Sequence, residues 1–130
     1  MWDQSGWSSG EPRWRVATMR PGSTPLFNLA EAMRDALDLA EEPAALAEQL
    51  RANPRTLGEL ARTKVRSDEG LLLLIDQLEE MVTIAPTGER TAFGEAVTRA
   101  LDSRTIYLVT TTRSDLVPEL QRGLPSLAGL

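Results

Sequence analysis

The segment that most constrains the fold of this chain is residues 71–75, which read LLLLI. These five apolar residues follow the polar turn of residues 67–70 and end abruptly at Asp76. Five residues are too few for an independent helix, and an unbroken apolar run lacks the alternation of a strand with one wet face. Such a run is typical of a strand that is buried on both faces, as in a parallel sheet covered by helices.

Strand and helix patterns alternate on both sides of this segment. Alternating or continuous apolar residues predict two further strands, at residues 14–20 and 105–111. Apolar residues spaced by three and four predict helices over residues 25–40, 44–51, 56–65 and 87–101, and a short helix starts at Arg113. This alternation predicts an α/β fold, a three-layer sandwich with about three parallel strands flanked by helices. We expect one domain over residues 13–130 and a disordered tail over residues 1–12.

The composition removes several kinds of chemistry. The chain has neither His nor Cys, which excludes Ser-His-Asp triads, imidazole and thiolate metal sites, cysteine nucleophiles and disulfides. Its formal net charge of -5 argues against a nucleic-acid-binding module, which normally presents a basic face. We expect no membrane contact and a cytoplasmic location, because no basic and apolar leader opens the chain and its longest apolar run is too short to span a bilayer.

The first of two polar clusters, DQLEE, follows residues 71–75 directly. If the chain turns helically there, Asp76 has Glu79 and Glu80 as neighbours at three and four residues, so the three carboxylates can converge. Converging carboxylates favour a hard cation, and Mg²⁺ is the natural candidate because it takes few protein oxygens and keeps places for water and phosphate. The alternative is a solvated acidic helix start, which the helix dipole favours.

The second cluster, Thr110-Thr111-Thr112-Arg113, comes at the end of the strand predicted at residues 105–111. Functional groups collect at the carboxyl ends of the strands in a parallel sheet, so both clusters stand where a site is expected. The guanidinium of Arg113 can contact a phosphate through two planar donors, or it can pair with a surface acid.

Taken together, the clusters resemble the nucleotide-binding core of the STAND signalling NTPases. In that family an hhhhD strand ends in the Walker B acid and the next strand ends in an hhhTTR sensor, and residues 71–76 and 108–113 match these motifs. The DQ-x-EE string is most similar to the novel-STAND bacterial branch and is also similar to the NACHT branch. Arg20-Pro21-Gly22 resembles the RPG segment of the novel-STAND branch. The resemblance covers roughly residues 13 to 124.

The resemblance implies a partial P-loop NTPase core of the ASCE type and a role for each polar residue. Asp76 would hold Mg²⁺, Glu79 or Glu80 would orient or deprotonate the attacking water, and Arg113 would stabilise charge on the transferred phosphoryl group. The complete parent would bind and slowly hydrolyse ATP or GTP as a conformational switch in signalling. Gln77 stands where related ATPases often have their catalytic Glu, which leaves the base open between Glu79 and Glu80.

A P-loop of the form G-x-x-x-x-G-K-[ST] is missing from these 130 residues, whose one lysine, Lys64, stands between Thr63 and Val65. In the family this motif lies just before the region that Trp14 opens, so we expect the chain to begin after it. Without the phosphate cradle, we expect the chain alone to be inactive and to bind no nucleotide tightly. The family places the P-loop strand beside the sensor strand, so the strand at residues 105–111 should have an unpaired apolar edge that favours self-association or protein partners.

Two other functions fit the same residues. A non-catalytic α/β protein-interaction module would leave Asp76, Glu79 and Glu80 facing solvent. A metal-dependent hydrolase built on carboxylates alone would need further acids near Asp76, because the chain has no imidazole.

Overall fold

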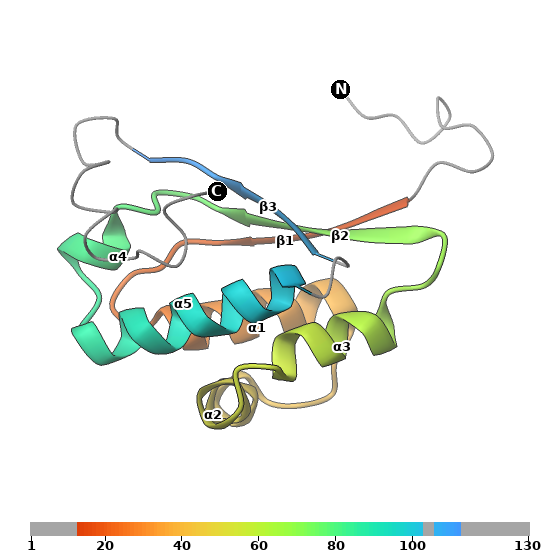
Figure 1. Ribbon diagram of the computed structural model, residues 1–130, viewed down its shortest axis with the longest axis horizontal. Helices are drawn as coiled ribbons and strands as arrows, with labels where there is room; N and C mark the ends of the chain where they lie inside the picture. The colour runs from red at the N-terminus through yellow and green to blue at the C-terminus, as the bar shows by residue number, and fades with distance from the viewer. Residues whose placement is uncertain (1–12, 103–105, 113–130) are drawn as a thin grey trace.

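The computed structural model describes residues 13–102 and 106–112 (Figure 1). The described elements follow in the order β1 (Arg13–Met19), α1 (Pro25–Leu37), α2 (Pro43–Ala52), α3 (Thr56–Lys64), β2 (Glu69–Ile75), α4 (Glu80–Thr83), α5 (Thr87–Asp102) and β3 (Ile106–Thr110). The three expected strands and the four expected helices of this region are confirmed, with ends that differ by a few residues. The expected tail and the helix expected from Arg113 lie outside the described residues.

The three strands form one parallel sheet in the order β1-β2-β3, with the apolar strand β2 in the centre. Met19 is paired with Ile75, and Ile75 with Thr110, so the three strands end at the same edge. Each connection moves across the sheet in the same direction and contains helix, as in a chain of right-handed crossovers. The α/β fold with three parallel strands flanked by helices is therefore confirmed.

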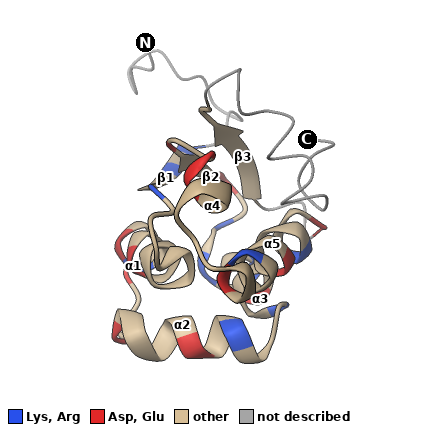
Figure 2. Ribbon diagram, turned by 90° about the vertical axis from the view of Figure 1, so that its left-hand side faces the viewer, with Lys and Arg blue, Asp and Glu red and all other residues tan. Residues whose placement is uncertain are grey.

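The longer described helices lie on one side of the sheet, and the short α4 lies at its carboxyl edge (Figure 1). Figures 1 and 2 show α1, α3 and α5 packed beneath the strands, with α2 farther from the sheet. On β2, Leu71, Leu73 and Ile75 are fully buried, whereas Leu72 and Leu74 are half-buried. The expected burial of β2 on both faces was thus wrong for residues 13–102 and 106–112. The reason is topological, because crossovers of one hand that move in one direction place their helices on one face.

The core lies between the sheet and the helices. All five described helices and β2 contribute its largest fully buried side chains, among them Leu26, Leu29, Met33, Leu50, Leu57, Leu73, Met81 and Phe93. The apolar stripe of α1 has the spacing of three and four that the sequence shows, which explains why this helix packs where it does. The helix ends at Leu37 rather than at residue 40, because Asp38 adopts a left-handed conformation (φ 55°).

The other face of the sheet is apolar and partly exposed. Val16, Leu72 and Tyr107 form one row across the three strands, and the side chains of Val16 and Tyr107 are about half exposed. The Trp14 ring packs edge-on against Tyr107, with 5.1 Å between ring centroids. Gly70 makes this possible, because a Cβ there would lie 2.8 Å from the Trp14 ring.

The edge of the sheet at β3 is unpaired within the described part of the chain, where β3 forms its ladder with β2 alone. Val109 on this strand is 46% exposed. The expected unpaired apolar edge is therefore present among the described residues. None of the helices in this part of the chain has the length and apolarity that a bilayer crossing requires.

Candidate functional site

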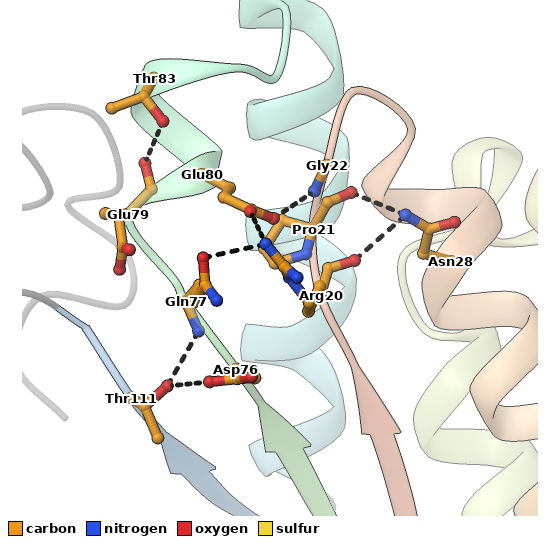
Figure 3. A network of polar contacts seen from close by, with 10 residues as sticks. All are labelled: Arg20, Pro21, Gly22, Asn28, Asp76, Gln77, Glu79, Glu80, Thr83 and Thr111. Atoms are coloured by element: carbon orange, nitrogen blue, oxygen red, sulfur yellow. Dashed lines mark hydrogen bonds and ion pairs between the residues drawn. The ribbon is translucent and has the colours of Figure 1, made fainter.

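The candidate site lies at the carboxyl edge of the sheet, where Arg20, Asp76 and Thr111 follow β1, β2 and β3 (Figure 3). Backbone hydrogen bonds continue the ladder one residue beyond the strands. The Asp76 N–H donates to the Met19 carbonyl at 2.8 Å, and the Thr111 N–H donates to the Ile75 carbonyl at 2.9 Å. The backbone thus fixes the positions of Asp76 and Thr111.

Thr111 orients the Asp76 carboxylate. Its hydroxyl donates to Asp76 Oδ1 at 2.5 Å and accepts a hydrogen bond from the Gln77 N–H at 2.9 Å. The Thr111 carbonyl accepts a further bond from the Leu78 N–H at 2.8 Å. The two clusters that the sequence places on separate strands therefore meet, as predicted, and the threonine ties the turn after β2 to the end of β3.

Gln77 separates the three carboxylates. It has a left-handed backbone (φ 59°), so no helix starts at Asp76, and α4 begins only at Glu80. The prediction that Asp76, Glu79 and Glu80 converge on one helix turn was conditional on a helical Asp76, and that condition is not met. Within the described ranges, no group of three or more carboxylates is arranged to hold a metal ion.

Glu80 turns toward β1 and bonds the RPG segment. Its Oε2 accepts from Arg20 Nη2 at 2.6 Å, and its Oε1 accepts from the Gly22 N–H at 3.0 Å. Arg20 Nη2 also donates to Gln77 Oε1 at 2.9 Å. The hydrogen bond to Glu80, and next the negative charge of Glu80, raise the pKa of the Arg20 guanidinium.

Both glutamates of the cluster are buried, with Glu79 at 7% and Glu80 at 8% exposure. A solvated acidic helix start would leave them in water, so that alternative does not describe this segment. Figure 3 shows the Glu79 side chain turned away from the Arg20–Glu80 pair. The Glu79 carbonyl accepts a hydrogen bond from the Thr83 hydroxyl at 3.2 Å.

A pocket of about 380 Å³ opens beside Asp76 and Arg20, between the end of β1 and α1. Glu31 and Asp35 of α1 line its far side. Asp76 is therefore accessible at the edge of a cavity rather than enclosed in the core.

The family of the chain follows from a comparison of its whole length. The sequence model of the novel STAND NTPase 1 family matches residues 4–130. The chain belongs to this family. The resemblance to the STAND NTPases is thus confirmed at the level of the family. Neither the curated proteins nor the solved structures contain a match to this chain.

The residues of this STAND NTPase chain fit a Mg²⁺ ion that is held mainly by phosphate and water. Asp76 Oδ1 bonds Thr111, whereas Asp76 Oδ2 makes no hydrogen bond or ion pair within the described residues. Mg²⁺ in phosphate-transfer sites usually takes one or two carboxylates and completes its shell with water and substrate oxygens. One accessible carboxylate at a fixed strand end meets that requirement.

Sequence reasoning identified Asp76, Glu79, Glu80 and Arg113 as site residues. Arg113 lies outside the described residues. Arg20 and Thr111 belonged to the motifs but had no individual role. One signal could have found them, because each directly follows the last residue of a strand, as Asp76 does.

Proposed function

We propose that this chain is part of the nucleotide-binding domain of a STAND signalling NTPase, with its carboxyl edge facing the Mg²⁺ ion and the phosphates. The proposal includes a three-layer core of the P-loop NTPase type in the complete parent. That parent binds and slowly hydrolyses ATP or GTP as a conformational switch. These 130 residues contain no P-loop, and by themselves they are inactive and bind nucleotide weakly.

The observation that best supports the proposal is the hydrogen bond between Asp76 and Thr111. It joins the acid after the central strand to the threonine after its neighbour, at one edge and in a fixed geometry. Phosphoryl transfer depends mainly on positioned charges and needs no covalent chemistry from the protein, so a rigid strand-end carboxylate suits it.

Each polar residue has a role in this proposal. Asp76 holds the Mg²⁺ ion, which would neutralise charge on the phosphate oxygens. Glu79 or Glu80 orients the attacking water or accepts its proton. Arg113 contacts the γ-phosphate and stabilises the charge that develops on it.

The test is a titration of the isotope-labelled chain with Mg²⁺ and ATP, followed by amide resonances. We expect shifts at Gln77 and Thr111 at millimolar ligand that require Mg²⁺ and disappear in Asp76→Asn. Asp35→Asn is the matched control, because it neutralises an acid of the same pocket away from the strand ends. Shifts that are absent at this edge, or that persist in Asp76→Asn, would contradict the proposal.

A non-catalytic α/β interaction module is the second candidate, and the exposed apolar row of Val16, Leu72 and Tyr107 favours it. Such a module would bind a protein through the open sheet face and would show no Mg²⁺-dependent response to ATP. Its expectation that Glu79 and Glu80 face solvent disagrees with their burial. The same titration separates the two functions.

A further inference from the structure

The turn of residues 20–22 is held rigidly against α1. Asn28 Nδ2 donates to the carbonyl of Arg20 at 3.1 Å and to that of Pro21 at 2.9 Å. Gly22 adopts a left-handed conformation (φ 59°), which aims its N–H at Glu80. The two Asn28 bonds therefore hold the backbone that presents Arg20 without any contribution from the segment after β2.

From this turn, Arg20 holds both ends of the segment that carries Glu79. One guanidinium nitrogen bonds the Gln77 side chain at the start of the segment and the Glu80 carboxylate at its end (Figure 3). The backbone of Gln77 is in the left-handed conformation. Residues other than glycine adopt this conformation at an energetic cost, and it persists where surrounding contacts enforce it. The Arg20 and Thr111 bonds are contacts of that kind.

The Glu80 side chain has little capacity left for proton transfer. It is 10% exposed, one oxygen accepts from Arg20, and the other accepts from the Gly22 N–H. A general base must lie within hydrogen-bond reach of the proton that it accepts, either directly or through one water. Both oxygens of the Glu80 carboxylate already accept hydrogen bonds from the end of β1, so this side chain is engaged in holding that contact.

We infer that Arg20 and Glu80 are a positioning pair, which clasps the end of β1 to the segment after β2. The inference rests on the proposed function in one respect, because that function gives the positioned segment, from the Asp76 turn to Glu79, its role. The clasp itself is a property of these 130 residues without nucleotide. Arg20 is 57% exposed, so the pair adds little to global stability and acts locally.

The test is residue-resolved amide hydrogen exchange in the 130-residue chain with Arg20→Gln. Because hydrogen bonds to charged groups are strong locally, we expect the Gly22 and Gln77 amides to exchange about tenfold faster or more, while the Leu73 amide of the central strand is unchanged. Arg20→Lys keeps the charge and should restore most of the protection. Arg51→Gln is the matched control, because it breaks an ion pair with Glu89 that joins α2 to α5 and involves no residue of the clasp, so it should leave both amides unchanged.

Three results would overturn the inference. The first is that the amide exchange rates of Gly22 and Gln77 in Arg20→Gln stay within about twofold of the wild-type rates, because the loss of one hydrogen bond should change them by more than that. Equal acceleration in Arg51→Gln, or no rescue by Arg20→Lys, would also overturn it. If Arg20→Gln loses the protection of Leu73, Glu80→Gln takes its place with the same expectation at the same amides. These measurements use no nucleotide, so a negative Mg²⁺-ATP titration would remove the proposed function and leave the clasp to be judged by itself.

Discussion

Replacing Thr111 by Val tests whether the hydroxyl, rather than the backbone, orients the site. Valine has nearly the same shape and suits extended backbone equally well, so the substitution removes the bonds to Asp76 and Gln77 and little else. The backbone bonds of Thr111 to Ile75 and Leu78 remain.

The magnitude follows from the two lost bonds and their exposure. One bond to a carboxylate and one to an amide would together contribute about 2–4 kcal/mol if both were buried. Thr111 is exposed, so water replaces part of both bonds, and we expect a loss of about 1 kcal/mol in the free energy of unfolding. The Gln77 amide, which loses its acceptor, should also exchange faster.

The assay is urea denaturation of the wild type, Thr111→Val and Thr112→Val, with the midpoint compared at unchanged slope. Thr112 is exposed, and its hydroxyl makes no hydrogen bond within the described residues, so its replacement should be neutral. If Thr112→Val lowers stability as much as Thr111→Val, or if Thr111→Val leaves both stability and Gln77 exchange unchanged, the hydroxyl does not hold the turn.

Three further substitutions probe other parts of the structure. Gly22→Ala places a Cβ on a left-handed residue at 3.3 Å from Asn28 Nδ2, and we expect thermal denaturation to show a loss of about 1–2 kcal/mol; an unchanged melting temperature would contradict the strain. The Arg66 N–H lowers the pKa of Glu69 by hydrogen bonding its carboxylate, so this group stabilises the fold above its unfolded pKa and the contribution is lost as the pH falls through the lower folded value. Glu69→Gln should therefore flatten the acid limb of a stability-versus-pH curve, and an identical limb would count against the bond. Val109→Lys puts a charge on the exposed edge strand and should reduce concentration-dependent association in sedimentation velocity, whereas equal oligomer populations would show that β3 is not the associating edge.

The sequence pattern was sufficient to predict most of the helices and strands and the edge of the sheet at which the candidate site lies. The run at residues 71–75 and the spacing of α1 depend on neighbours within one or two turns, which is the range over which hydrophobic periodicity acts. Because parallel strands end at one edge, two polar strand ends in the sequence already implied that Asp76 and Thr111 would be neighbours.

Only the tertiary structure decided which partner each polar side chain of residues 76–80 bonds. Glu80 bonds Arg20 across 60 positions of sequence, and no local pattern states which of three neighbouring acids such a partner will take. The left-handed Gln77 prevents the helix turn that would have gathered the acids, and it persists because contacts from β1 and β3 hold it. The single covered face of the sheet likewise depends on the order and direction of the crossovers, which only the assembled strands determine.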